Sequence, residues 1–241
     1  MQIITWNCQM AFRKKSQEVL KSKPDILVIP ECENKDRLQF GKLTPEPTDF
    51  FWYGDNPHKG VGIFSYSDYH FRLIDSFNPS FKYVLPIQVT GKRNFLLIAI
   101  WAMPNKDNHK QRYIGQVWSG LQYYKNLLAK DTILIGDFNG NQIWDNNAYT
   151  GNFTQTLTFL EERQYKSLYH LQTGEAYGKE TQPTFYLHRN QEKPYHLDYC
   201  IVKNSMIQKG FSLEVGRYKD WITFSDHVPL IVRLTVDGRY T

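Results

Sequence analysis

The chain has few cysteines and no cysteine–histidine cluster. Its 241 residues include Cys8, Cys32 and Cys200, an odd number that lacks the close spacing of metal ligands. Each lies in or beside an apolar run, which predicts reduced thiols in a reducing compartment. None of the three is a strong candidate for a catalytic nucleophile.

Long hydrophobic runs are absent as well. The chain opens directly with MQIITWN, without a basic leader and an apolar signal core, and no apolar run approaches the roughly 20 residues needed to span a bilayer. We therefore expect a cytoplasmic protein with no membrane partner. The sequence indicates no obligate protein partner and leaves the oligomeric state open.

Repeats, low-complexity tracts and long linkers are also missing, and the prolines and glycines are scattered as turn residues. We therefore predict one continuous domain over residues 1–241. With 41% hydrophobic and 22% charged residues the chain can bury a full core. Its net charge of +5 is compatible with a polyanionic partner and equally with a basic surface that serves solubility.

Short β-branched or aromatic segments predict about ten strands. Helical periodicity is clearest over 111–129, and shorter helices are expected over 11–22 and 154–164. Ten strands exceed what one compact sheet usually holds, so we expect a mixed α/β arrangement with at least two sheet surfaces. The predicted strands are Gln2–Trp6, Ile26–Ile29, Val61–Tyr66, Tyr83–Val89, Phe95–Trp101, Thr132–Ile135, Thr184–His188, Leu197–Val202, Phe211–Val215 and Val228–Val236.

Oxygen ligands or an imidazole stand at the margins of five separate apolar runs. A turn alone explains any one of them, including the Asp and Asn of ILIGDFNGN at 133–141. If the strand ends meet, however, several carboxylates crowd together, which is costly unless a cation or retained protons compensate. Ligands of this type favour Mg²⁺, with Mn²⁺ as a substitute, over Zn²⁺, and they suit a phosphoester hydrolase. The residues are Asn7, Glu31, Asp137, Asn139, Asp198, Asp226 and His227.

The segments that carry these residues resemble the ordered motifs of the endonuclease/exonuclease/phosphatase superfamily, which includes exonuclease III, AP endonucleases and deoxyribonuclease I. They span nearly the whole chain, in the family's order and with comparable spacing. The resemblance implies a four-layered α/β sandwich, in which two mixed β-sheets pack face to face with helices outside. The motifs are TWNC at 5–8, PECE at 30–33, GDFN at 136–139, HLDYCIV at 196–202 and SDHVPL at 225–230.

The resemblance also implies a metal site. Glu31 would be the main ligand of Mg²⁺, and Asn7 and Asp226 would contribute directly or through water. The family's activity, hydrolysis of a phosphoester, would take place beside this ion.

The same resemblance implies four catalytic residues. Asp137 would orient or deprotonate the attacking water, and Asn139 would hold a phosphate oxygen. His227 would stabilise the phosphate charge or move a proton, with Asp198 bonded to its other ring nitrogen.

Two positions depart from the family's pattern. Gln9 stands where many relatives carry an acidic or amide residue, which weakens the case for two tightly held metals. Trp101, in IAIWAMPN, lies nearest the place of a His or Tyr in relatives, and an indole cannot usefully move a proton. His196 is a candidate for helping the leaving group, the alternative being a half-buried strand histidine.

Candidate substrate-binding residues lie around these motifs. Asn105, in the same loop as Trp101, would contact a phosphate or simply form a turn. Trp221, just before SDHVPL, would stack on a base or belong to the core. With His196, these residues form the expected substrate-binding set.

The leading hypothesis is a Mg²⁺-dependent phosphodiester hydrolase, a nuclease that acts on DNA or alternatively on RNA. The second is a phosphatase or phosphodiesterase for a small phosphorylated metabolite or nucleotide. The third is a binding module of the same fold with weak catalysis, motivated by Trp101 and Gln9. Compactness favours the first, because the chain lacks the long insertions of lipid-directed and inositol-phosphate-directed relatives.

Overall fold

The computed structural model describes residues 1–106, 108, 110, 112–146 and 150–235, and most of their strands form two six-stranded sheets. The first sheet contains, in spatial order, β13 (Phe211–Val215), β14 (Leu230–Leu234), β1 (Gln2–Thr5), β2 (Ile26–Cys32), β4 (Lys59–Ser65) and β3 (Asp49–Asn56). The second contains β5 (Tyr69–Leu73), β6 (Val84–Gly91), β7 (Phe95–Trp101), β8 (Thr132–Asp137), β12 (Asp198–Lys203) and β9 (Tyr165–Ser167).

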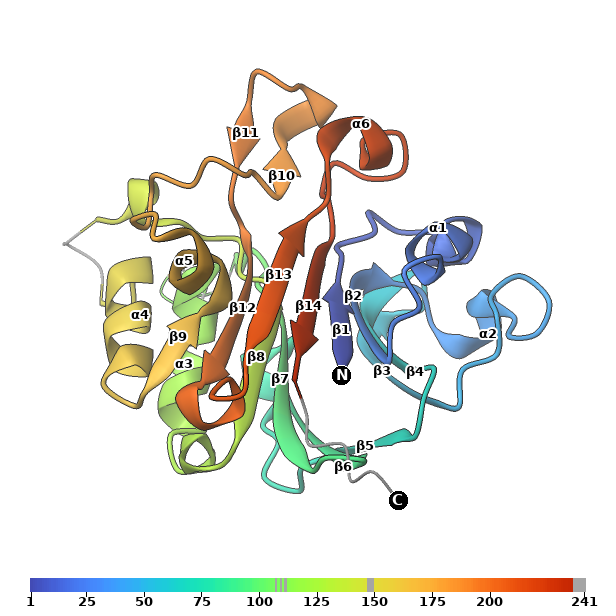
Figure 1. Ribbon diagram of the computed structural model, residues 1–241, viewed down its shortest axis with the longest axis horizontal. Helices are drawn as coiled ribbons and strands as arrows, with labels where there is room; N and C mark the ends of the chain where they lie inside the picture. The colour runs from blue at the N-terminus through green and yellow to red at the C-terminus, as the bar shows by residue number, and fades with distance from the viewer. Residues whose placement is uncertain (107, 109, 111, 147–149, 236–241) are drawn as a thin grey trace.

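Both sheets are mixed, because one parallel pair lies among antiparallel pairs in each. β1 runs parallel to β2 in the first sheet, and β7 runs parallel to β8 in the second. A separate two-stranded hairpin, β10 (Phe185–Tyr186) with β11 (Pro194–Tyr195), projects at one end of the molecule (Figure 1).

Helices cover the outer side of each sheet, whereas the helix over Leu168–Thr173 contacts strands of both sheets (Figure 1). The helices are α1 (Ser16–Leu20), α2 (Lys35–Leu38), α3 (Ile114–Tyr123), α4 (Phe153–Glu161), α5 (Leu168–Thr173) and α6 (Tyr218–Trp221). Helices α3 and α4 share a buried cluster with one face of the second sheet, whereas α1 packs beside the first. The expected four-layered α/β sandwich is therefore confirmed.

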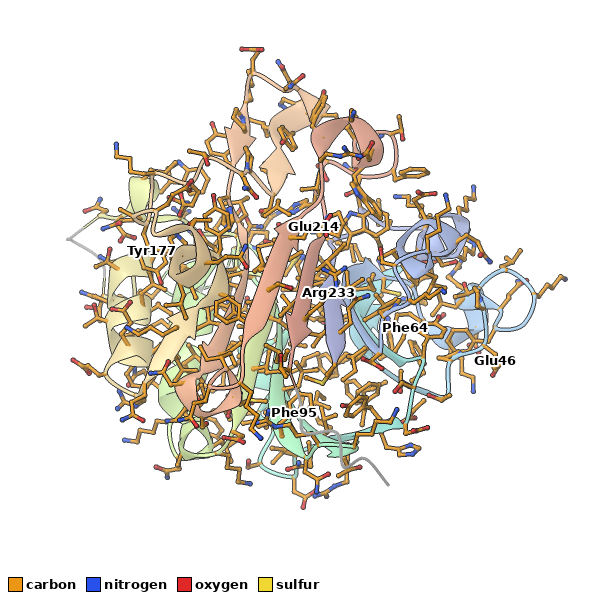
Figure 2. All side chains as sticks on the ribbon, viewed as in Figure 1. Glu46, Phe64, Phe95, Tyr177, Glu214 and Arg233 are labelled. Carbon is orange, nitrogen blue, oxygen red and sulfur yellow. The ribbon has the colours of Figure 1, made fainter. Side chains whose placement is uncertain are left out.

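The alternation of side chains along β7 shows how the layers are built. Its odd residues over 97–101 join the core between the sheets, and its even residues over 96–100 pack under α3 and α4. Large side chains fill both spaces (Figure 2). The same alternation on β8 and β12 directs the buried Asp137 and Asp198 toward the space between the sheets, at the last residue of β8 and the first of β12.

Several predicted elements are shorter than expected. The strand predicted over Thr184–His188 is extended only at Phe185–Tyr186, because His188 adopts a left-handed φ of 56° in a tight turn. The helix expected over 111–129 is α3 followed by a 3-10 turn at Leu127–Ala129, and residue 111 lies outside the described residues. The final predicted strand ends at Leu234, and Val236 also lies outside them.

The two other predicted helices also differ. The segment 11–22 divides into a 3-10 turn at Phe12–Lys14 and α1, because Ala11 takes a left-handed φ of 52° and Lys15 leaves the helical region. The helix predicted over 154–164 is α4. It begins at Phe153, one residue earlier than predicted, after the Asn152 cap, and it ends at Glu161. No helix among the described residues is long and apolar enough to cross a membrane.

Candidate active site

Three predicted site residues of the first sheet lie where its central strands end, and we call this line of strand ends the site edge. Because β1 and β2 are parallel and β14 is antiparallel to β1, the end of β1, the end of β2 and the start of β14 lie together. Asn7 follows β1, Glu31 lies in β2, and Asp226 precedes β14. The Ser225 hydroxyl donates to the Asn7 carbonyl at 2.8 Å, which ties the first and last of these segments.

The second sheet contributes a matching edge. Asp137 ends β8 and is paired in register with Asp198, the first residue of antiparallel β12. On the other side of β8, Trp101 ends the parallel strand β7 and is the register partner of Asp137. Three predicted residues therefore come from adjacent positions on three neighbouring strands.

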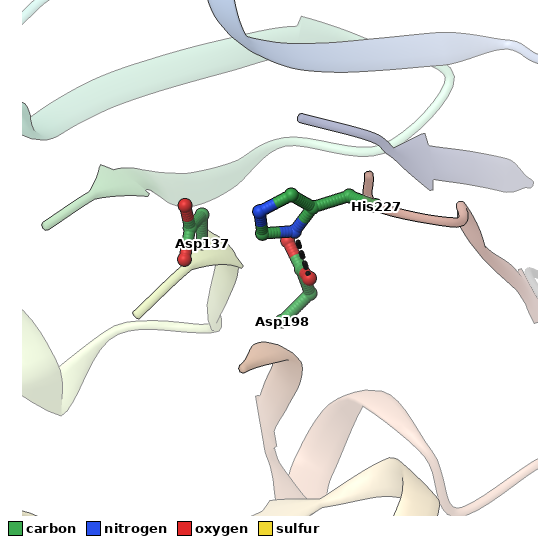
Figure 3. Close-up of side chains that lie close together, drawn as sticks. All are labelled: Asp137, Asp198 and His227. Atoms are coloured by element: carbon green, nitrogen blue, oxygen red, sulfur yellow. Dashed lines mark hydrogen bonds and ion pairs between the residues drawn. The ribbon is translucent and has the colours of Figure 1, made fainter. Parts of the chain in front are cut away.

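Two hydrogen bonds join the two edges across the sandwich. The Asn7 side-chain amide donates to Asp137 Oδ2 at 3.0 Å, and His227 Nδ1 lies 2.8 Å from Asp198 Oδ2. Figure 3 shows the second bond and the other ring nitrogen of His227 turned toward Asp137. Ligand atoms of Asp137, Asp198 and His227 all lie within 4.8 Å of one another, and all three residues are buried.

Burial and mutual charge set the protonation of this cluster. Burial raises the pKa of Asp137 to about 7, although the cationic form of His227 and the Asn7 amide act against the shift. Burial alone would lower the pKa of His227, but the Asp198 carboxylate outweighs it and raises that pKa to about 10. At neutral pH the imidazole is therefore cationic, while Asp137 is only partly ionised.

Backbone contacts orient the GDFN segment. The Asn139 amide N–H donates to Asp137 Oδ1 at 2.9 Å, so both carboxylate oxygens of Asp137 accept bonds from the protein. The Asn139 side chain donates to the Ala102 carbonyl at 3.3 Å.

The three predicted metal ligands lie at this edge. Asn7 is buried and bonds to Asp137, whereas Glu31 and Asp226 are only partly buried. Glu31 has a left-handed φ of 60°, and its carboxylate lies 4.0 Å from Lys59 Nζ with 20% of the side chain exposed. Asp226 Oδ2 accepts a bond from the Gln9 side chain at 2.9 Å. With Asn7 these groups offer only oxygen donors, which is the set that suits Mg²⁺ or Mn²⁺.

Two of the four predicted substrate-binding residues, Trp101 and Trp221, are buried in the core. Trp101 is 2% exposed and packs against Tyr83 with ring centroids 4.7 Å apart, while Lys59 Nζ lies 5.1 Å from its ring centroid. Trp221 packs edge-on against Trp6 at 5.0 Å. Burial of this kind leaves little ring surface for stacking on a base.

The other two predicted substrate-binding residues, His196 and Asn105, are hydrogen-bonded to other parts of the protein. His196 is buried, with Nδ1 2.8 Å from the Gln182 carbonyl and Nε2 without a partner among the described residues. Burial lowers the pKa of His196, so its ring is neutral at pH 7. Asn105 accepts a bond from the Asn108 N–H at 2.9 Å, which is the turn-forming arrangement.

A cavity of about 860 Å³ is lined by Asn139, two residues after Asp137, and by the loops beside it. Its walls include the exposed rings of Tyr113 and Trp144 and the cationic side chains of Lys110 and Arg112. The sequence did not predict this cavity, because it is formed by loops that meet only in the folded chain.

One residue near the site has no local sequence signal. Arg189, in the turn of the β10–β11 hairpin, donates to Gln9 Oε1 at 2.6 Å, and the two residues are 180 positions apart in the sequence. A contact of that separation cannot be read from spacing. Composition alone would have classed Arg189 as one more surface cation.

The architecture and the site edge together define a protein with the fold of the endonuclease/exonuclease/phosphatase superfamily. No family model and no curated protein matches the sequence. Solved structures do match it over almost its full length.

The 3′-5′ exonuclease NExo from Neisseria meningitidis is 18% identical, with a TM-score of 0.65, covering 98% of this chain and 100% of its own. A structure of the 3′ phosphatase NExo from Neisseria bound to a product DNA hairpin is 19% identical, with a TM-score of 0.68 and the same coverage. An AP endonuclease from Archaeoglobus fulgidus is 16% identical, with a TM-score of 0.68 and again the same coverage. At such identities the likeness establishes the fold.

Proposed function

We propose that the chain is a Mg²⁺-dependent phosphodiester hydrolase, a nuclease that acts on DNA or alternatively on RNA. The proposal rests on the buried cluster of Asp137, His227 and Asp198 where the two sheets meet. One ligand atom from each residue lies within 4.8 Å of the other two. Three solved structures of the same fold are described as a 3′-5′ exonuclease, a 3′ phosphatase with a DNA hairpin and an AP endonuclease, which supports a nucleic-acid substrate.

Asp137 is the proposed base. A general base works best when its pKa lies near the working pH, and burial raises the pKa of Asp137 to about 7. The bonds from Asn7 and from the Asn139 N–H fix the direction of its carboxylate. We propose that Asp137 orients a water molecule and takes its proton.

His227 and Asp198 form the proposed cationic unit. Asp198 holds the imidazole through Nδ1 and keeps it protonated, so its other nitrogen presents a positive charge toward Asp137 and any phosphate bound beside it. Asn139 is proposed to hold a phosphate oxygen at the same place.

Glu31, Asn7 and Asp226 are the proposed ligands of the divalent ion. When bound, the ion would neutralise charge on the phosphoryl oxygens and the departing oxygen. The cavity lined by Trp144, Lys110 and the other residues beside Asn139 is the proposed place for the nucleotides that flank the reacting phosphate.

The test is hydrolysis of fluorescent single-stranded and double-stranded oligonucleotides, with Mg²⁺ and with EDTA, beside a panel of nucleotides and sugar phosphates. We expect cleavage of oligonucleotides that EDTA abolishes. Asp137→Asn and His227→Ala should each lower the rate by at least about 100-fold, because each removes a proton-transfer or charge-stabilising group. His70→Ala, a change at an exposed histidine, serves as the control.

Two results would overturn the proposal. Cleavage at the parent rate by both site variants would show that the site assignment is wrong. Hydrolysis of small phosphorylated compounds without any cleavage of oligonucleotides would instead identify a metabolite phosphatase.

A further inference from the structure

Three loops meet beside the proposed site through one glutamine. Gln9 Nε2 donates to Asp226 Oδ2 at 2.9 Å, and Gln9 Oε1 accepts from the Arg189 guanidinium at 2.6 Å. Gln9 follows β1, Asp226 precedes β14, and Arg189 lies in the β10–β11 hairpin. The neutral amide thus links a cation of the hairpin to a carboxylate of the site edge.

The hairpin holds Arg189 in a defined place. Its guanidinium also donates to the Thr223 carbonyl at 3.1 Å and to the Phe224 carbonyl at 3.4 Å, and its own carbonyl accepts from the Tyr218 hydroxyl at 2.8 Å. Arg189 has a left-handed φ of 57°, a backbone conformation that costs a non-glycine residue free energy. Surface arginines are rarely fixed at both the backbone and the side chain in this way.

The fixed guanidinium remains open to solvent. Arg189 is exposed, and its three bonds within the described residues leave two of its five N–H donors for another partner. Its three present acceptors are neutral oxygens, so its positive charge is not neutralised by them. A phosphate oxygen is the partner that matches both the positive charge and a free N–H donor of this guanidinium.

We propose that Arg189 binds a backbone phosphate of the nucleic acid next to the reacting one, and that Gln9 is the positioning residue that holds it there beside Asp226. This inference rests on the proposed function for the identity of the ligand. It explains the glutamine: a carboxylate at position 9 would neutralise Arg189 and repel Asp226, whereas the amide bonds to both.

The experiment measures binding of a fluorescein-labelled DNA duplex by anisotropy in EDTA, at salt concentrations from 25 to about 200 mM, so that no cleavage occurs. We expect Arg189→Ala to weaken binding about tenfold at low salt and to reduce the slope of log K against log salt by roughly 1, because one phosphate contact is lost. Arg72→Ala, which removes an exposed arginine on β5 at the other end of the molecule, should change neither value (Figure 1).

Gln9→Ala tests the positioning role. It keeps the charge of Arg189 and should keep most of the salt slope, but it should weaken binding, and the double variant should bind no worse than Arg189→Ala alone. Additive losses in the double variant would overturn the positioning role. Melting temperatures within about 2 °C of the parent would show that all variants fold.

The outcomes separate this inference from the proposed function. If the parent cleaves oligonucleotides but Arg189→Ala binds them with the parent's affinity and salt slope, the inference is wrong and the proposed function stands. If the parent binds DNA in an Arg189-dependent way but cleaves nothing, the proposed function is wrong and the phosphate site stands. No binding by the parent at any salt concentration overturns the inference.

Discussion

At His227 two opposing effects decide the charge of one imidazole. Burial favours the neutral ring, whereas Asp198 favours the cation and raises the pKa to about 10. The folded-state pKa therefore lies above the ordinary value near 6.5, so folding takes up a proton between these values. The stability that this protonation contributes is complete below about pH 6.5 and is lost as the pH rises through about 10.

Replacing Asp198 with Asn should remove the negative charge that keeps the His227 ring protonated. We expect the pKa of His227 in Asp198→Asn to fall toward its ordinary value near 6.5, because burial is then opposed only by more distant carboxylates. The measurement is the pH dependence of the histidine Cε1–H signals by NMR, in EDTA. The signal absent from His227→Ala identifies the residue.

Asp49→Asn is the matched control for this prediction. It removes a carboxylate 3.6 Å from the exposed His70 and should leave the midpoint of His227 unchanged. An unchanged midpoint in Asp198→Asn as well would mean that the bond between His227 and Asp198 does not set the charge of the ring.

The strand-end positions of Asp137, Asp198 and His227 in the candidate site were predictable from the sequence, because each stands at the margin of an apolar run. The link from Gln9 to Arg189 was not predictable. It depends on a hairpin turn folding back over the start of the chain, and neither local spacing nor composition encodes that contact.

At the scale of elements, the predicted strands of the sheet interior were largely right. Of the four edge strands, β13 was predicted with its exact bounds and β3, β5 and β9 were missed. Strands β7 and β8 are continuous apolar runs that pack on both faces, so their sequences show their burial directly. In contrast, β3 and β5 lie at sheet edges and carry polar or exposed residues. Strands β9 and β11 are too short to show a period.

The end of β8 depends on one glycine. Gly136 has a φ of +139°, and a Cβ built on it would lie 2.0 Å from the Ile100 carbonyl oxygen of the paired strand. Gly136→Ala should therefore lower the free energy of unfolding by about 3 kcal/mol, combining backbone strain with a backbone clash that cannot relax cheaply. It should also displace Asp137 and lower activity. Urea unfolding measures the first effect.

Gly174→Ala separates strain from clash. Gly174 also has a positive φ, of +74°, but no atom lies within 4 Å of a Cβ built there. Its substitution should cost only about 1 kcal/mol, the penalty of the left-handed conformation alone. Equal losses in the two variants would show that the approach of β7 to Gly136 is not what requires glycine.

At the scale of the whole molecule, the proposed chemistry depends on two sheets meeting at one edge. Neither sheet alone carries all of the proposed residues: Asn7 and His227 are among those of the first sheet, and Asp137 and Asp198 among those of the second. The bonds of 3.0 and 2.8 Å between these pairs join the sheets at the site. Any ligand that binds only the assembled edge must therefore stabilise the folded chain.

A divalent ion is the simplest such ligand. At a concentration 100 times its dissociation constant it would stabilise the fold by about 2.7 kcal/mol. For a chain of this size that corresponds to a rise in melting temperature of about 5–10 °C. We expect Mg²⁺ or Mn²⁺ to produce this rise and EDTA to abolish it, as measured by differential scanning calorimetry with each variant compared with and without metal.

The location of the ion decides which substitution removes the rise. Glu31→Gln should abolish it, since Glu31 is the proposed main ligand, whereas Glu46→Gln, at an exposed carboxylate on the periphery, should retain it (Figure 2). A rise that survives Glu31→Gln but disappears in Asp198→Asn would place the ion in the buried cluster instead and would contradict the assignment to Glu31. The comparison distinguishes metal binding at Glu31 from metal binding at Asp198 without any substrate. The metal-dependent rise in melting temperature should disappear only in the variant that has lost the ligand.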